Sequence, residues 1–214
     1  MTSTVHVVRH GEVHNPEGVL YGRLPDYHLS ELGRAMAERI AQSLVGRDVT
    51  YLVSSPLDRA RETIAPSAAL LGIQPDVDDR LVEAANVFEG KRFGVGDGAL
   101  REPSAWWHLR NPFRPSWGEP YDVIAARMLA AIEDAAAAAQ GHEAVVVSHQ
   151  LPIWTARNAA QGKRLWHDPR ARECSLASVT SFTLDGREVR QVAYSEPAAD
   201  LLPVKPKRRF QVGA

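Results

Sequence analysis

Five side chains in this 214-residue sequence have the types needed to handle a phosphomonoester: Arg9, His10, Arg59, Glu83 and His149. Arginine presents a planar fork of donors that matches two phosphate oxygens and stays charged at any working pH. A neutral imidazole can attack phosphorus, and a protonated carboxyl can pass its proton to the leaving oxygen. Taken alone, most of these residues have ordinary structural roles. Whether they form a site depends on whether the predicted secondary structure brings them together.

Three strands with a core-like pattern are predicted, at residues 4–10, 48–55 and 143–149. The last is a continuous β-branched run, as in a central strand that is covered on both faces. Helices are predicted at 30–44 with Ser30 as the cap, at 56–71 with a break or kink at Pro66, at 120–141, and around Pro152. This alternation predicts an α/β sandwich with helices on both sides of one mixed sheet.

The other segments are predicted to be less regular. We expect a long loop at 11–29, a short edge strand and turn at 72–84, and a loop with one short helix at 86–119. A β-hairpin is predicted at 176–196, with its turn at Asp185 and Gly186.

The candidate residues stand where the predicted strands end. His10 and His149 each follow a strand, and the Ser-Ser-Pro sequence at 54–56 ends the second strand and leads to Arg59. In α/β folds of this kind, ligands bind at the carboxyl ends of the strands. Three separate strands should therefore direct polar groups into one crevice.

Four motifs in this order, "VVRHG", "VSSPLDRARET", "LVE" before "FEG", and "VVVSH", resemble the histidine phosphatase superfamily, also called the phosphoglycerate mutase-like family. The resemblance covers residues 5 to about 160, and a compatible hairpin follows. It implies a three-layer α/β/α sandwich with a mostly parallel central sheet. It also implies one catalytic domain at 1–200, with a lid or specificity insert at about 86–119 and a basic tail at 201–214.

The resemblance implies a role for each candidate. His10 is similar to the nucleophile that becomes phosphohistidine, and its second ring nitrogen is expected to donate to a backbone carbonyl. Arg9 and Arg59 are similar to the phosphate-clamping arginines, and His149 to the second histidine, which binds phosphoryl oxygens. Glu83 is similar to the general acid, with Glu89 as the competing candidate.

Four further residues are expected to bind substrate: Gly11, Asn15, Arg23 and Gln150. Gly11 would allow close approach of the backbone and offer its N–H to phosphate. Here the sequence departs from the family, which often has "RHGxTxxN" and "SHGG" where this chain has "RHGEVHN" and "SHQLPIW". Gln150 has a second interpretation, as the first residue of a helix.

The insert contains aromatic and basic residues. Trp106, Trp107, Phe113 and Trp117 are interpreted either as packed lid residues or as walls of a substrate pocket, and Arg101, Arg110 and Arg114 as contacts to a second anionic group on the substrate.

Composition excludes several classes of function. With 25 basic and 26 acidic residues and a net charge of −1, no global field attracts nucleic acid or a membrane. One cysteine, Cys174, excludes a disulfide framework, and no apolar run approaches the roughly 18 residues of a membrane span. No signal peptide is visible, so a cytoplasmic location is expected.

His10 and His14 have a zinc-like spacing on a helix, but Gly11, Asn15 and Pro16 disfavour a helix there, and no metal is expected.

Three functions remain open from the sequence. The favoured one is a metal-independent phosphatase that acts on a small phosphorylated metabolite and needs no cofactor. The second is a phosphoglycerate mutase-type transferase, which would need a bisphosphoglycerate primer; the insert lacks the Arg-Arg pair of the family's mutases. The third is a binding module without catalysis. The family contains monomers and homodimers, and either state is expected.

Overall fold

A six-stranded sheet forms the centre of the protein in the computed structural model, which describes residues 1–92 and 117–202. The strand order is β3-β2-β4-β1-β5-β6. The first four are parallel to one another, and β5 and β6 add an antiparallel hairpin in which β5 pairs antiparallel with β1. The strands span Thr2–Arg9 (β1), Val49–Ser54 (β2), Asp76–Val77 (β3), Glu143–Ser148 (β4), Val179–Asp185 (β5) and Glu188–Ser195 (β6).

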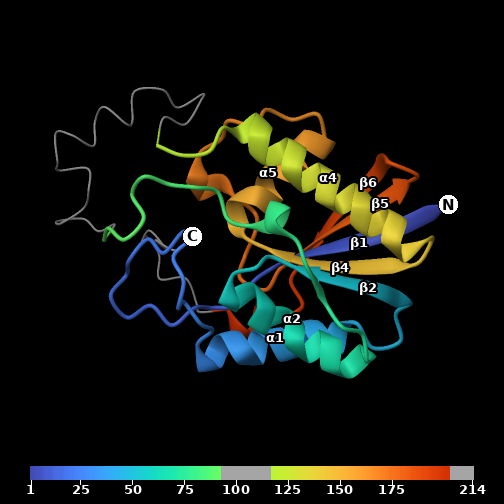
Figure 1. Cartoon of the computed structure of the whole chain (residues 1–214), viewed down its shortest axis with the longest axis horizontal. Helices are drawn as coiled ribbons and strands as arrows, with labels where there is room; N and C mark the ends of the chain where they lie inside the picture. The colour runs from blue at the N-terminus through green and yellow to red at the C-terminus, as the bar shows by residue number, and fades with distance from the viewer. Residues whose placement is uncertain (93–116, 203–214) are drawn as a thin grey trace.

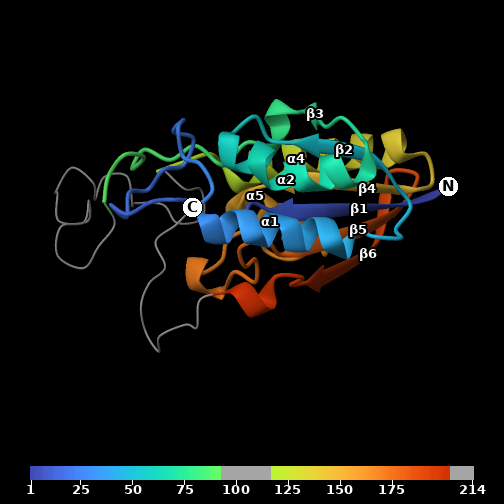
Figure 2. The same ribbon diagram turned by 90° about the horizontal axis from the view of Figure 1, so that it is seen from below.

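Helices cover both faces of this sheet (Figures 1 and 2). One face carries α1 (Glu31–Ser43) and α2 (Asp58–Leu71), and the other carries α4 (Tyr121–Ala139) and α5 (Gln150–Ala160). The short 3₁₀ helices are η1 (Asp79–Leu81), η3 (Pro169–Ala171) and η4 (Ala199–Leu201). The predicted three-layer α/β/α sandwich with a mostly parallel sheet is confirmed.

The central strand β4 shows why its sequence is an unbroken apolar run. Val145 and Val147 belong to the core under α1 and α2, whereas Ala144 and Val146 belong to the core under α4 and α5. A strand that is covered on both faces has no side for polar residues, so its pattern does not alternate.

The local signals in the sequence place most helix starts correctly. Ser30 caps α1, with its side chain accepting a hydrogen bond from the Gly33 N–H, and Pro152 lies in the first turn of α5. Of the break or kink predicted at Pro66, the break is wrong, since α2 continues through this residue, and the kink stays a prediction. Ile64 and Ser67 are buried on either side of Pro66, and this packing holds the helix across the missing N–H.

The less regular segments agree in outline with the prediction. The edge strand in 72–84 is reduced to the two residues of β3, followed by η1, and the hairpin turn lies at Gly186, which has a φ of 61°. Most of the insert, including its predicted short helix, and the tail from residue 203 lie outside the described residues. Within the described residues, no helix is long and apolar enough to cross a membrane.

Candidate active site

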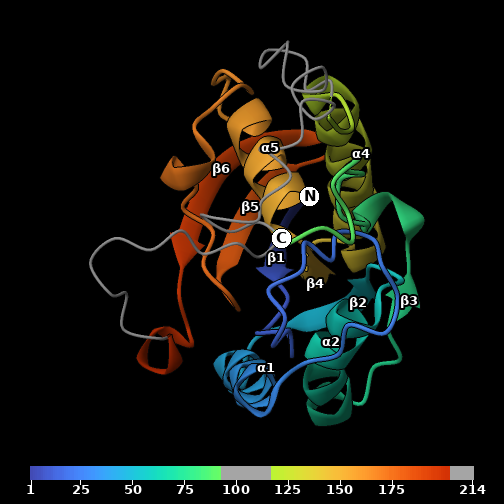
Figure 3. The same cartoon turned by 90° about the vertical axis from the view of Figure 1, so that its left-hand side faces the viewer.

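The carboxyl ends of three neighbouring strands meet at one edge of the sheet, and Figure 3 looks onto that edge. The register pairs the last residue of β1 with the last residue of β4, so His10 and His149, which follow them, lie side by side with ring centroids 5.1 Å apart. Ser55, after β2, places its Oγ 2.8 Å from Nε2 of His149. The three strands thus bring these polar groups together, as predicted, and the crevice itself stays a prediction.

His10 is oriented as a nucleophile requires. Its Nδ1 lies 2.8 Å from the Gly11 carbonyl oxygen, which can only accept, so Nδ1 carries the proton. Its Nε2 is buried and has no hydrogen-bond partner within residues 1–92 and 117–202, which leaves that lone pair available. Burial, reinforced by the charges of Arg59 and Arg9, lowers the pKa of His10 well below its usual value. The imidazole is therefore neutral at neutral pH.

Two buried guanidinium groups flank this imidazole. Arg59 is 1% exposed, donates to the Gly22 carbonyl, and places its guanidinium carbon 4.8 Å from the centre of the Tyr21 ring. It forms no ion pair with a described carboxylate, and its Nε has no hydrogen-bond partner in that part of the chain. Arg9 donates from a terminal nitrogen to the Cys174 carbonyl over 2.7 Å. A buried cation without an ion-pair partner is costly, and an anion bound beside Arg59 would reduce that cost.

His149 is fully buried beside His10. While Nε2 contacts Ser55, Nδ1 has no hydrogen-bond partner among the described residues. Burial is the main cause that lowers the pKa of His149 well below its usual value, and Arg59 adds to it. A neutral ring with one free nitrogen can contact a phosphoryl oxygen if that nitrogen carries the proton.

Glu83 brings a carboxyl group to the same edge. Its side chain is 3% exposed, Oε1 accepts from the Ala84 N–H over 2.8 Å, and Oε2 is buried without a hydrogen-bond partner in the described chain. Burial raises the pKa of Glu83 even though Arg59, Arg172 and Arg9 act in the opposite direction. A carboxyl whose protonated form is favoured, with one oxygen free, has the properties of a general acid.

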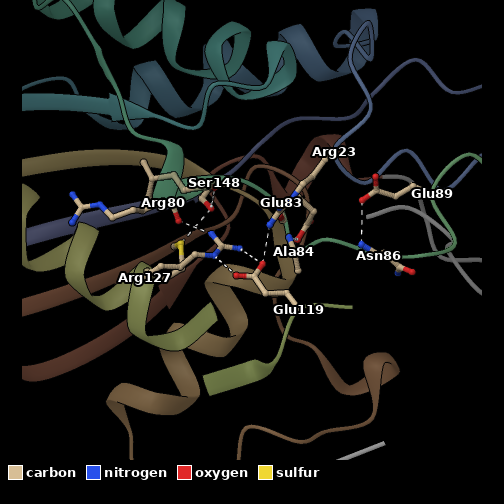
Figure 4. Close-up of polar contacts among 11 residues, drawn as sticks. Arg23, Arg80, Glu83, Ala84, Asn86, Glu89, Glu119, Arg127 and Ser148 are labelled. Atoms are coloured by element: carbon tan, nitrogen blue, oxygen red, sulfur yellow. Dashed lines mark hydrogen bonds and ion pairs between the residues drawn. The ribbon is translucent and has the colours of Figure 1, made fainter. Parts of the chain in front are cut away.

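A salt-bridge network contacts the backbone at Glu83 (Figure 4). Arg23 donates to the Glu83 carbonyl over 2.6 Å and to Glu119 over 2.8 Å. Arg127 binds both oxygens of Glu119 and donates to the Arg80 carbonyl. In this structure Arg23 thus holds the backbone of the candidate acid, and its predicted contact with substrate stays a prediction.

Gly11 is required by close packing. A Cβ at this position would lie 2.6 Å from the Gly33 carbonyl oxygen at the start of α1, and no side chain fits in that space. Its N–H donates over 3.1 Å to Oγ1 of Thr63, which in turn donates to the Arg59 carbonyl. The N–H that was expected to face phosphate is therefore used to join the loop after β1 to α2.

Asn15 and Gln150 are engaged with the protein in this structure. The Asn15 side chain donates to the Val19 carbonyl over 2.8 Å and accepts from the Val19 N–H over 3.1 Å, which orders the loop. Gln150 begins α5, and its amide contacts the Cys174 carbonyl and Arg172 at 3.4 Å each. Substrate binding by either residue stays a prediction, and the geometry favours the interpretation of Gln150 as the first helical residue.

Glu89, the competing candidate for the acid, lies beside Gly22, whose carbonyl accepts from Arg59, and its charge opposes the lowered pKa of that arginine. Glu89 accepts from the Asn86 N–H over 3.2 Å and is separated from Glu83 in Figure 4. His14 is exposed in the loop. Within the described ranges, the only cluster of three or more groups suited to a metal ion is Asp26, His28 and Asp58, which includes none of the predicted site residues.

Sequence reasoning missed two residues of this site. Tyr21, buried in the long loop, packs on Arg59 and presents its ring edge-on to His10, with centroids 6.4 Å apart. Arg172 follows η3 and lines, with Glu83, a cavity of about 90 Å³. The sequence could not distinguish Arg172 from its neighbours Arg164 and Arg170, because nothing in the local pattern says which arginine turns inward.

The described ends of the insert border that cavity. Trp117 lines it together with Leu20 and Tyr121. The other insert residues with predicted roles lie outside the described residues: Arg101, Trp106, Trp107, Arg110, Phe113 and Arg114.

Comparison with known proteins places this geometry in context. The model of the histidine phosphatase superfamily (branch 1) matches residues 5–197. The chain is 59% identical over 195 residues to the uncharacterized protein Rv0525 of Mycobacterium tuberculosis, covering 91% of this chain and 96% of that protein. It is 29% identical to the probable phosphoglycerate mutase GpmB of Photorhabdus laumondii, covering 82% and 83%. A structure of a mycobacterial glucosyl-3-phosphoglycerate phosphatase with VO3 is 27% identical, covers 90% of this chain and 97% of that one, and has a TM-score of 0.71.

Proposed function

The chain belongs to the histidine phosphatase superfamily, and on that premise we propose that it is a phosphomonoester hydrolase that acts through phosphorylated His10 on a small phosphorylated metabolite. The observation that carries the proposal is the state of His10: neutral, fixed through Nδ1, and with a free Nε2 beside two buried arginines. A nucleophile for phosphoryl transfer needs these three properties together.

The first half-reaction transfers the phosphoryl group to the enzyme. Nε2 of His10 forms a bond to phosphorus while the bond from phosphorus to the ester oxygen breaks. Glu83 gives its proton to that oxygen, and the alcohol leaves. Arg9, Arg59 and His149 hold the phosphoryl oxygens and stabilise their charge through the transition state.

The second half-reaction restores the enzyme. Glu83, now a carboxylate, takes a proton from a water molecule that attacks phosphorus, and the bond between Nε2 and phosphorus breaks. Inorganic phosphate leaves, and His10 and Glu83 return to their starting states. The residues supply positioning, charge and one proton, and no step requires a metal ion or an organic cofactor.

A panel of phosphomonoesters tests the proposal directly. Phosphate release is measured with chelator present, for the wild type and for His10→Ala. We expect release from at least one ester that survives chelation and is lost in the variant. Faster conversion of 3-phosphoglycerate to its 2-isomer than release of phosphate would instead support the transferase activity that the similarity to the probable mutase GpmB suggests. Release that persists in His10→Ala would refute the phosphohistidine route.

A further inference from the structure

Arg172, like Arg59, forms no ion pair with a carboxylate among the described residues, whereas other arginines near it do. Arg23 and Arg127 pair with Glu119, and Arg157 pairs with Glu173. Arg172 instead donates to two uncharged acceptors, Nε2 of His167 at 2.8 Å and the side-chain oxygen of Gln150 at 3.4 Å. Burial lowers the pKa of Arg172, the charge of Glu83 opposes this shift, and the two residues line the same cavity.

The orientation of Arg172 is fixed by its contact with His167. Nδ1 of that ring donates to the Leu165 carbonyl over 2.6 Å, so Nε2 carries the lone pair that accepts from Arg172. The ring packs between Tyr121 and Trp154, with centroids 5.6 and 5.9 Å away. Burial lowers the pKa of His167, which keeps it an acceptor at neutral pH. The guanidinium is held in place before any ligand arrives.

Arg172 keeps enough donors for a planar anion. A guanidinium has five N–H bonds. The contacts with His167 and Gln150 use Nε and one hydrogen of a terminal nitrogen. Three N–H bonds remain at the terminal end, where a carboxylate can accept two of them in parallel.

The position of Arg172 is on the leaving-group side of the reaction. Glu83 must contact the ester oxygen, and Arg172 lines the same cavity as Glu83. Leu20, Trp117 and Leu151 form apolar walls there. Because Glu83 and Arg172 line one cavity of about 90 Å³, a group that reaches Arg172 lies near the ester oxygen.

We propose that Arg172 is a specificity-determining residue that binds a carboxylate on the alcohol part of the substrate, held in place by His167. The preferred substrates are then small phosphomonoesters with a carboxylate a few bonds from the ester oxygen. This proposal rests on the hydrolase function proposed above, and it adds a residue and a substrate class to it.

The test uses two pairs of esters that differ in the carboxylate: O-phosphoserine with O-phosphoethanolamine, and 3-phosphoglycerate with glycerol 3-phosphate. The ratio of kcat/KM within each pair is measured for the wild type and for Arg172→Gln. We expect the wild type to prefer the carboxylated member of at least one pair, and the variant to lower that preference about tenfold or more, as for a lost charged hydrogen bond. Arg164→Gln, an exposed arginine of the same segment, is the matched control and should keep the wild-type ratio.

Competitive inhibition by inorganic phosphate distinguishes two roles of Arg172: binding of the substrate's carboxylate, and binding of the phosphoryl group beside Arg9 and Arg59. Arg172→Gln should keep the inhibition constant of phosphate, because phosphate has no alcohol part. A large rise in that constant would overturn the proposal, as would an equal loss on both members of each pair or the lack of any preference in the wild type. In all three outcomes the hydrolase function stands; failure of the wild type to release phosphate from any ester would refute that function itself.

Discussion

At the scale of single residues, burial shifts the pKa values of three titratable groups of the site toward their uncharged forms, beside two arginines. Burial lowers the pKa of His10 and of His149, and burial raises the pKa of Glu83. Each shift favours the neutral form. In the proposed reaction the arginines would neutralise a phosphate dianion, and the raised pKa of Glu83 favours the protonated form that the leaving oxygen needs.

The role of Glu83 predicts a dependence on the leaving group. Glu83→Gln should slow turnover by about 10²- to 10⁴-fold for alkyl esters, whose poor leaving groups need a proton, and far less for an aryl ester such as p-nitrophenyl phosphate. The measurement is kcat for both ester types, with Glu89→Gln as the control because Glu89 lies outside the cavity. Equal losses for all esters would exclude Glu83 as the acid.

At the scale of elements, the site depends on the tight approach of the loop after β1 to the start of α1. A Cβ on Gly33 would lie 2.0 Å from the Glu12 carbonyl oxygen, and one on Gly11 would lie 2.6 Å from the Gly33 oxygen. His10 is held between β1 and this contact. Because these two backbone segments approach so closely, they fix the direction in which the His10 side chain points.

Gly33→Ala should therefore destabilise the protein, although glycine to alanine in a helix ordinarily stabilises by about 0.5–1 kcal/mol. The backbone shift forced by the Cβ is expected to cost about 1–3 kcal/mol in the free energy of unfolding. Urea denaturation measures it, with Glu38→Ala on the exposed face of α1 as the control, expected within about 0.5 kcal/mol of the wild type. A Gly33→Ala protein as stable as the wild type would contradict this packing.

The salt-bridge network behind Glu83 makes a second prediction at this scale. Glu119→Gln leaves Arg23 and Arg127 without their shared carboxylate, which is 13% exposed. We expect a loss of about 1–2 kcal/mol in stability and a lower kcat for alkyl esters, with inhibition by inorganic phosphate unchanged. Weaker binding of phosphate itself would show instead that the network supports the phosphate clamp.

The elements could be predicted from the sequence because their signals are local. The β-branched run of β4, the cap at Ser30 and the turn at Gly186 each reflect the chemistry of a few residues. The break at Pro66 was wrongly predicted because tertiary packing, which has no local signal, holds α2 together.

The candidate site was likewise predictable where its residues belong to local motifs. Strand ends and family motifs located His10, Arg59, Glu83 and His149, which the structure brings to one edge. Arg172 and Tyr21 lie in loops, and their inward positions depend on contacts with residues distant in sequence. The hydrogen bonds that the Arg23 and Asn15 side chains form within the protein could not be predicted from the sequence for the same reason.

At the scale of the whole molecule, the buried histidines couple stability to pH. In the unfolded chain His10 and His149 take up protons near pH 6.5, whereas in the folded protein their lowered pKa values keep them neutral. The unfolded state then binds more protons below pH 6.5, so stability falls as pH decreases, by up to about 1.4 kcal/mol per pH unit for each imidazole. Glu83, whose pKa is raised, acts in the opposite direction.

Urea denaturation between pH 7.5 and about 5.5 checks this coupling. The free energy of unfolding should decrease below pH 6.5, and His149→Gln should reduce the slope, whatever it does to the absolute stability. A slope that is unchanged in the variant would show that the His149 ring is protonated in the folded protein.

The most direct test of the account as a whole is the trapping of the phosphorylated enzyme. The wild type is mixed with its best ester, quenched with base within milliseconds, digested, and examined by mass spectrometry, with His10→Ala as the control. The account predicts one added phosphoryl group on the peptide that contains His10, formed before free phosphate appears and absent from the variant. Phosphate release at full rate with no phosphorylated His10 at any time would contradict it.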